Sequence, residues 1–282
     1  ICDIKYNLLE SNHTNYIRIP TLIKANGFLA NFIAKLPIFP VWNIEEDVFW
    51  GDIDGQKHVT RGSTIQSRFS QKYFGQAKGI SFLSTIVNNY SVNVKVISSN
   101  DHESHSVFDL VRGNMTDIPI NKITGDTHTV NQLNFIALDA INVEFVPAIK
   151  NIKGHAEKLY CTENISQYDG LIKPYGKVNL GLIRKHKNDI LKVLLSLILQ
   201  ENTQCVIIKK LSSHKRYSRL KLAIWEYNKI FKSLHILNMI NDISLRKSIK
   251  KSRNRTEAYH QQQKVISKVY DGMLKGKKTV EN

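Results

Sequence analysis

Cysteine is scarce in this chain of 282 residues, which holds only Cys2, Cys161 and Cys205. No two of them form a Cys-x-x-Cys pair, so the usual motif of a structural zinc site is absent. An odd and sparse count is typical of a reducing cytosol and not of a disulfide framework. We therefore interpret the three cysteines as small buried apolar residues.

Long apolar runs are also missing. The longest, residues 190–199, is shorter than the roughly 18–20 residues that span a bilayer and predicts a buried helix. The first residues, Ile1-Cys2-Asp3-Ile4-Lys5, lack the charged and apolar regions of a signal peptide. We expect no membrane partner, and the absence of an initiator Met predicts a piece of a longer protein.

Acidic residues are rare in the C-terminal third. Residues 205–282 contain 19 Lys and Arg against 5 Asp and Glu, which is a net charge of +14 out of +16 for the whole chain. Such a basic segment favours a nucleic acid as the partner. The alternative is a solvated helical surface from a proteome rich in Lys, Ile and Asn, although such surfaces normally mix charges of both signs.

The remaining pattern predicts a folded α/β chain, because 42% of the residues are hydrophobic and their spacing changes along the sequence. Residues 1 to about 40 look helical and break at Pro37 and Pro40. Strands are predicted at 48–54, 79–87, 92–97, 118–126 and 143–149, with a turn at Asn88-Asn89. Helices are predicted at 103–112, with Ser99 or Asp101 as the cap, and at 130–141, 188–200, 219–240 and 256–273.

The order of these elements indicates a fold. Three strands in an antiparallel meander, then helix, strand, helix and strand, is the order of the ribonuclease H-like fold. That fold has a mixed five-stranded sheet with flanking helices. Its first and fourth strands lie side by side, which would bring Asp54 and Asp126 together.

Two isolated acids occupy notable positions. Asp54 follows a hydrophobic run in Asp54-Gly55-Gln56, and Asp126 follows another in Gly125-Asp126-Thr127. Carboxylates at two strand ends can hold hard divalent cations, and in a basic protein this favours phosphodiester chemistry. Two-metal sites usually need a third acid, and Glu257 is the acid of the basic stretch 246–268. The alternative for Glu257 is a first-turn residue that favours the helix dipole.

Six blocks in order resemble the catalytic domain of the Tn-three family of bacterial transposases, which are replicative class II enzymes. The blocks are Asp54-Gly55-Gln56, Tyr73-Phe74-Gly75 with Lys78-Gly79, Asp126-Thr127-His128-Thr129, Phe145-Val146-Pro147-Ala148-Ile149-Lys150, Lys210-Leu211-Ser212-Ser213 and Asn254-Arg255-Thr256-Glu257-Ala258. They extend from about residue 48 to residue 265.

The resemblance implies a DDE transposase whose catalytic residues and metal ligands are Asp54, Asp126 and Glu257. It implies two Mg²⁺ ions, with Mn²⁺ as a substitute, which support DNA strand cleavage to a 3′-OH and then strand transfer. It also implies four regions: the tail of an upstream helical region (1–45), the ribonuclease H-like core (46–150), a helical insertion (151–245) and the catalytic glutamate helix with a truncated end (246–282).

The sequence departs from the family in two respects. Asp52 stands where the family usually has Ser, so Asp52 could be mistaken for the metal ligand. The family proteins are also several times longer and continue past the glutamate. A truncated, non-catalytic DNA-binding remnant is therefore the main alternative, and a stand-alone nuclease with a ribonuclease H-like core is another.

The expected partner is double-stranded DNA, both transposon ends and target, in the bacterial cytoplasm at the nucleoid, and full-length relatives are expected to dimerise on DNA. Beside the acids, His128 and His260 are candidates for orienting ligands or phosphate. The candidate phosphate contacts are Lys57, Arg61, Arg68, Lys72, Arg253 and Arg255, with Arg246 and Lys250 on the same basic face.

Overall fold

A mixed six-stranded sheet forms the centre of the computed structural model, which describes residues 19–60 and 64–268. The strand order is β2-β3-β1-β5-β6, and β4 pairs with β3 as well. The strands are β1 (Trp50–Val59), β2 (Arg68–Phe69), β3 (Lys78–Val87), β4 (Tyr90–Ser98), β5 (Lys122–Gly125) and β6 (Glu144–Phe145). A separate two-stranded sheet pairs β7 (Tyr160–Cys161) with β8 (Gly176–Lys177).

Strand direction changes across the sheet. β1, β3 and β4 are antiparallel neighbours, whereas β5 runs parallel to both β1 and β6. The β3–β4 connection has positive φ at both Asn88 (47°) and Asn89 (66°), as a tight turn between antiparallel strands requires and as Asn tolerates. The predicted meander, its turn and the adjacency of the first and fourth strands are confirmed.

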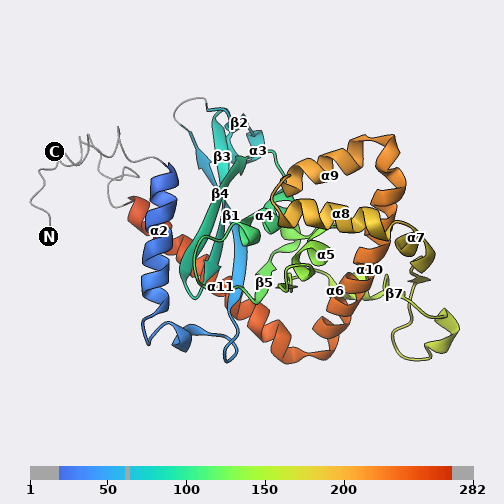
Figure 1. Cartoon of the computed structure of the whole chain (residues 1–282). Helices are drawn as coiled ribbons and strands as arrows, with labels where there is room; N and C mark the ends of the chain where they lie inside the picture. Colours follow the sequence, from blue (N-terminus) through green and yellow to red (C-terminus); the bar gives the residue numbers. More distant parts are fainter. Residues whose placement is uncertain (1–18, 61–63, 269–282) are drawn as a thin grey trace, which may run out of the picture.

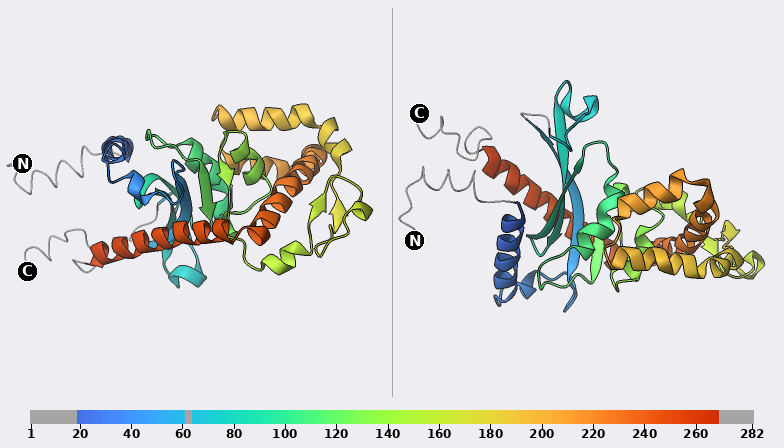
Figure 2. Two further views of the ribbon diagram at one scale, coloured as in Figure 1. Left: turned by 90° about the horizontal axis from the view of Figure 1, so that it is seen from below. Right: turned by 45° about the horizontal axis from the view of Figure 1, so that its top comes forward.

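The sheet is covered on both faces (Figures 1 and 2). α4 (Val107–Arg112) and α5 (Asn134–Asp139) pack on one face, and the long helix α11 (Ile243–Lys268) crosses the other. α2 (Ile19–Ala34) lies beside β4, where the Asn26 side chain bonds the backbone of Ser91. The other helices are α3 (Gln71–Phe74), α6 (Ile152–Ala156), α7 (Leu180–Lys185), α8 (Lys187–Ile198), α9 (Gln204–Ser213) and α10 (Ser218–Asn241). The 3₁₀ turns are η1 (Pro40–Trp42), η2 (Glu103–Ser106), η3 (Thr127–Thr129), η4 (Ile165–Gln167) and η5 (Lys215–Tyr217).

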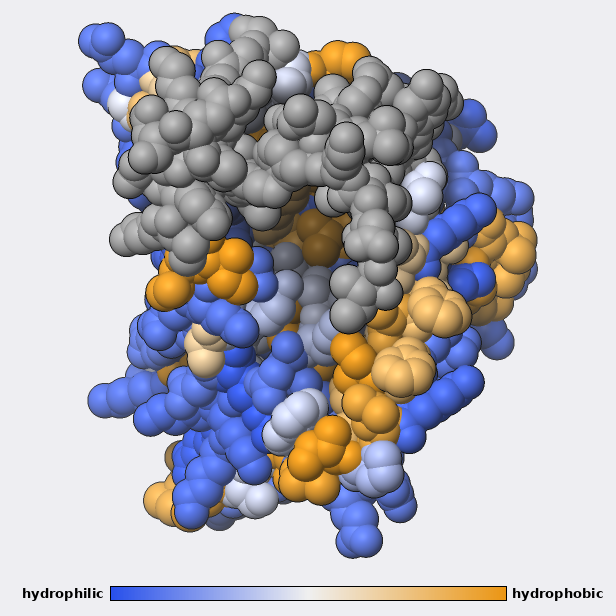
Figure 3. Space-filling model, turned by 90° about the vertical axis from the view of Figure 1, so that its left-hand side faces the viewer, coloured by the Kyte–Doolittle hydropathy of each residue, from blue (hydrophilic) through white to orange (hydrophobic). Residues whose placement is uncertain are grey.

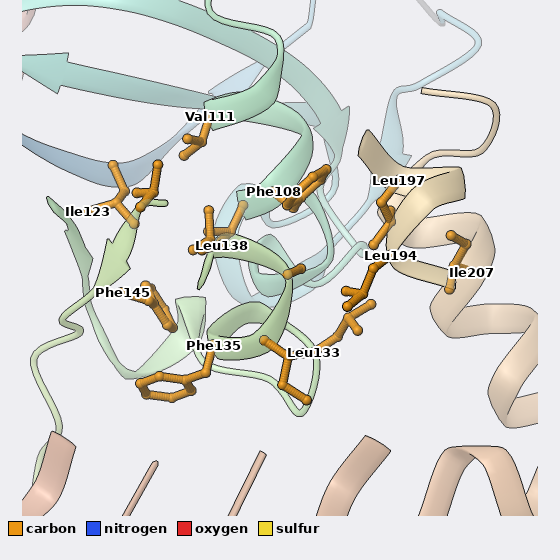
Figure 4. Close-up of a cluster of buried hydrophobic side chains, with 14 of the residues drawn as sticks. Phe108, Val111, Ile123, Leu133, Phe135, Leu138, Phe145, Leu194, Leu197 and Ile207 are labelled. Carbon is orange, nitrogen blue, oxygen red and sulfur yellow. The ribbon is translucent and has the colours of Figure 1, made fainter. Parts of the chain in front are cut away.

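The main core joins the sheet to helices from distant parts of the chain (Figure 4). Ile123 of β5 and Phe145 of β6 meet Phe135 of α5, and the rings of Phe135 and Phe145 are 4.8 Å apart. Leu194 and Leu197 of α8 continue the same cluster. The helices α8 to α10 are therefore packed onto the core, because they share its apolar interior.

A buried polar network reinforces this junction. The Gln204 side chain, at the start of α9, accepts from Phe108 N at 2.9 Å and donates to the Asn134 side chain. Asn134 in turn donates to the carbonyls of Ser104 and Thr129. Gln204 and Asn134 are completely buried. A group that lost its hydrogen bond in this network would therefore find no water to replace it. The network thus ties α9 to the loop that follows Asp126.

Several predicted boundaries were wrong. The first strand continues past Asp54 to Val59, because β3 pairs with it along its whole length although its second half is polar. The last helix begins at Ile243 and not near residue 256, since no Pro or Gly interrupts residues 243–268.

The other differences are smaller. The helix predicted at 130–141 is shortened to α5, and the fifth strand to β6, although two further parallel hydrogen bonds reach Ala148. The residue that caps the helical segment from Glu103 is His102, so the predicted caps Ser99 and Asp101 are wrong. Cys161 is buried as expected and Cys205 is partly exposed, whereas Cys2 lies outside the described residues.

Within the described ranges, no helix combines the length and apolarity needed to cross a membrane. Exposed apolar side chains do occur on α2, among them Phe28, Leu29 and Phe32. Figure 3 views the side of the molecule on which α2 lies and shows orange patches within a largely hydrophilic surface.

We predict that Gln204→Met destabilises the protein by about 2–4 kcal/mol, because the buried Phe108 N–H and Asn134 amide lose their partners. Urea unfolding at 25 °C measures the change. Gln262→Met, at an exposed position of α11, is the matched control and should change stability by less than about 0.5 kcal/mol. Equal unfolding midpoints for the two variants would show that the network does not stabilise the junction.

Candidate active site

Helix α11 lies along β1 and runs in the same direction. Ile249 packs against Trp50 in one cluster, Arg253 faces Asp52, and His260 faces Asp54. Further along, the charge of Lys264 reaches His58. The eight residue steps from Trp50 to His58 extend about 26 Å along the strand, and the fifteen from Ile249 to Lys264 extend about 22 Å along the helix. The two lengths are similar, so alternate strand residues meet successive turns of the helix. One face of β1 therefore presents its alternate residues to a single helix.

β1 and β5 bring the two predicted aspartates together. Ile53 pairs with Gly125 in the parallel register, so Asp54 and Asp126 follow at neighbouring positions. Asp126 caps η3: its carboxylate accepts from His128 N at 2.8 Å. The Thr129 side chain folds back so closely on Gly125 that a Cβ there would lie 2.6 Å from it. Glycine before Asp126 is thus a steric requirement of this turn.

Asp54 and Glu257 line one groove between β1 and α11. The groove has a volume of about 320 Å³ and is also lined by His260 and Lys264. Asp54 Oδ2 lies 3.1 Å from Nδ1 of His260, whose ring is buried. Glu257 lies well inside α11, and the helix dipole acts only on the first turn. The helix-dipole alternative for Glu257 is therefore excluded.

Asp52 occupies the same strand face as Asp54 but lies deeper. It is 1% exposed, and neither carboxylate oxygen has a well-aligned hydrogen-bond partner among the described residues. Arg253 Nη1 is 3.9 Å from Asp52 Oδ1. Burial raises the pKa of Asp52 to about 7; the Arg253 guanidinium and the Thr256 hydroxyl lower it, and the charges of Asp54 and Asp126 raise it further. Asp52 is thus closed off by α11, whereas Asp54 borders the groove.

Glu103 is a further acid near the site, and its proximity was not predicted from the sequence. A Cβ at Gly55 would lie 2.5 Å from the Glu103 carboxylate, so the glycine of Asp54-Gly55-Gln56 leaves room for this side chain. Burial raises the pKa of Glu103, the charge of Lys57 lowers it, and Asp126 and Asp54 raise it. The available signal was an acid at the start of the helical segment after the third strand of the meander.

The acids do not form a closed metal-binding group. In residues 19–60 and 64–268, no three His, Cys, Asp or Glu side chains come close enough to hold an ion together. The donors are nevertheless carboxylate oxygens, which hard divalent cations prefer. The donor chemistry therefore fits Mg²⁺ or Mn²⁺, although the structure does not show a complete ligand set.

The predicted phosphate contacts fall into two groups. Lys57 and Lys72 flank the Tyr73 ring, with Nζ at 4.1 and 5.0 Å from its centroid. Arg68 is exposed in β2 beside them. By contrast, Arg253 turns towards Asp52, and Arg255 donates to the carbonyl of Trp42. Arg61 lies outside the described residues.

The family of the chain follows from its similarity to known proteins. The family model described as Tn3 transposase DDE domain matches residues 1–282. The chain belongs to this family. No solved structure matches the chain.

Individual relatives are transposases. The chain is 25% identical over 260 residues to the transposase for transposon Tn4556 of Streptomyces fradiae, which covers 91% of this chain and 28% of the relative. It is 26% identical over 244 residues to the transposase for transposon Tn1546 of Enterococcus faecium, with coverages of 83% and 23%. The transposase for transposon gamma-delta of Escherichia coli (strain K12) is 26% identical over 249 residues, with coverages of 87% and 24%. The chain thus spans about a quarter of the length of these relatives.

We predict that Asp52→Asn changes stability in a pH-dependent way. The folded-state pKa of Asp52, about 7, lies above its ordinary value of 3.8, so folding binds a proton between these limits. Wild-type stability is therefore lost as pH rises through this range, by an amount on the order of 2 kcal/mol between about pH 5 and pH 8. Asp52→Asn has no carboxyl group at this position, so its stability should not fall in this way as pH rises.

Urea unfolding in EDTA measures the effect, and Asp52→Asn should gain stability relative to wild type on going from pH 5 to pH 8. Asp169→Asn is the control, since the Asp169 side chain is 95% exposed. A difference between wild type and Asp52→Asn that is the same at both pH values would contradict the buried, protonated Asp52.

Proposed function

We propose that this chain is the catalytic part of a DNA transposase and performs metal-dependent DNA strand cleavage and strand transfer. The observation that carries the proposal is the shared groove of Asp54 and Glu257, with Asp126 next to Asp54 in the β1–β5 register. Membership of the transposase DDE domain family supports the same reaction.

The proposed fold is a ribonuclease H-like core. Its support is the order β4-β3-β1-β5-β6, antiparallel in the first three strands and parallel in the others. In this proposal residues 46–150 form the core, residues 151–245 form a helical insertion, and α11 returns to the core with Glu257. The insertion is packed onto the core through Gln204 and the α8 leucines, which favours one rigid unit over a loose attachment.

Asp54, Asp126 and Glu257 would hold the divalent cations. A bound cation supplies charge neutralisation at the phosphate and a more acidic water. Beyond this, the chain's own residues orient the acids: His260 holds one oxygen of Asp54, and the backbone of His128 holds Asp126. α11 presents Glu257 across the groove, and Glu103 places a further carboxyl group against Gly55.

The basic residues suggest how DNA would reach the groove. Lys57 and Lys72 lie at the Tyr73 ring, and the exposed Arg68 of β2 donates to the carbonyls of Ile65 and Ser67. A second surface follows α11, where Lys247, Lys250 and Lys251 line a shallow hollow near Asn89. Phosphates attract such cations through long-range electrostatics. Arg253 and Arg255 would support α11 through their contacts with Asp52 and Trp42 instead of reaching DNA.

We predict that Asp54→Ala, Asp126→Ala and Glu257→Ala each abolish Mg²⁺-dependent cleavage, because each removes an oxygen ligand. The assay is nicking of supercoiled plasmid by the 282-residue chain. The new 3′-OH is detected by its own extension with a DNA polymerase. DNA binding, measured by fluorescence anisotropy without Mg²⁺, should remain close to wild type.

Asp117→Ala is the matched control, since Asp117 is exposed and lies before the start of β5, whereas Asp126 follows its end. Cleavage that survives all three active-site substitutions would overturn the assignment of these residues. A wild-type chain that binds DNA but never cleaves it would instead favour the non-catalytic DNA-binding alternative.

A further inference from the structure

A second polar pocket lies at α10, α6 and β7, and no residue of the acid-lined groove contributes to it. Its volume is about 260 Å³. The lining includes His155, Lys158, Lys229 and Lys232, and it contains no Asp or Glu. The pocket therefore gathers three lysines and a histidine without a carboxylate in its wall, and burial and the charges of Lys232 and Lys158 lower the pKa of His155.

Glu226 of α10, one residue from the lining residue Trp225, is already engaged. Glu226 Oε1 lies 2.5 Å from Nζ of Lys229, and its Oε2 accepts from Asn179 N at 2.9 Å. Lys229 is thus balanced, whereas Lys158 and Lys232 have no ion pair among the described residues. Burial lowers the pKa of Lys232, and the charge of Lys158 lowers it further. The like charges repel each other in a half-buried setting, and a bound anion would relieve this repulsion.

Neutral donors complete the wall. Asn228 is 2% exposed; its amide bonds the Gln132 side chain at 2.9 Å, and its carbonyl oxygen has no partner in the described chain. Rotating the side-chain amides of both Asn228 and Gln132 by about 180° keeps a hydrogen bond between them. It also places the NH₂ group of Asn228 where its unpartnered carbonyl oxygen now lies. Ser233 Oγ accepts from Tyr160 N at 3.0 Å, which leaves the hydroxyl hydrogen available. An anion with several oxygens matches these donors.

Two aromatic residues of the lining, Tyr160 and Trp225, each hold a lysine over the ring, and of these two lysines Lys229 lines the pocket. Lys229 Nζ lies 4.2 Å from the centroid of the Tyr160 ring, and Lys221 Nζ lies 4.8 Å from that of Trp225. Cations held over aromatic faces lose less freedom when a ligand arrives. Lys229 is therefore held in place at the pocket wall by Tyr160 and Glu226.

We propose that this pocket binds a phosphate group through Lys158 and Lys232, with His155, Asn228 and Ser233 as further hydrogen-bond donors. The source that the structure favours is the DNA backbone, and this part rests on the proposed function. A free phosphate is the other source, with the same recognition chemistry. The pocket would then hold DNA on the helical region, away from the acids.

The test compares Lys158→Gln/Lys232→Gln with Lys187→Gln/Lys192→Gln, two exposed lysines of α8 whose replacement removes the same charge. Both double variants and wild type are used as the full chain in EDTA. Binding of inorganic phosphate is followed by ³¹P line broadening, and binding of a DNA duplex by anisotropy across a KCl series. Thermal unfolding checks that each variant is folded.

We expect saturable phosphate broadening in wild type and in the α8 variant and none in the pocket variant. The pocket variant should also bind DNA about 5-fold or more weakly than the α8 variant, with a salt slope smaller by about one to two. Loss of phosphate binding with DNA affinity equal to that of the α8 variant would overturn the DNA assignment. Phosphate broadening that persists in the pocket variant would overturn the site itself.

Asp54→Ala separates this proposal from the proposed catalysis. It should keep phosphate binding at the wild-type level although it is predicted to lose cleavage. A wild-type chain without cleavage would therefore refute the catalytic proposal and leave phosphate binding in the pocket to stand or fall on its own measurement.

Discussion

The packing of α11 along β1 is the contact on which the rest of the site depends. It brings Ile249, Arg253, Thr256 and His260 over Trp50, Asp52 and Asp54. Without this helix, Asp52 would be solvated, and Glu257 would not share a groove with Asp54. The parallel pairing of β1 with β5 then adds Asp126 from the neighbouring strand.

The same packing gives two nearby aspartates different environments. Asp52 is sealed between the sheet and α11, where a carboxylate is costly to ionise. Asp54, two residues on, lies at the groove and contacts His260. An acid that is buried without good hydrogen bonds does not stabilise the fold by itself. Asp52 therefore needs a partner of opposite charge, and Arg253 of α11 lies opposite its carboxylate.

Local patterns predicted a large part of the sheet correctly. The Asn88-Asn89 turn and the alternation of β3 and β4 depend on neighbours in sequence, and the structure confirms both. The predicted end of β1 was wrong. Its polar second half is a strand because it pairs with β3, and the hydrophobic pattern of the sequence does not indicate such pairing. The start of α11 was also missed: the helix was predicted from residue 256, although no Pro or Gly between residues 243 and 256 would break it.

By itself, the sequence determined the chemistry available: isolated carboxylates within a basic chain, strands and helices of recognisable period, and a turn suited to Asn. Only the tertiary structure decided which acid is buried, that Glu103 approaches Gly55, and that lysines of α10 meet Lys158 across a pocket. The reason is physical. Turns and periodicity follow from interactions between near neighbours, whereas burial and charge clustering follow from how distant segments pack.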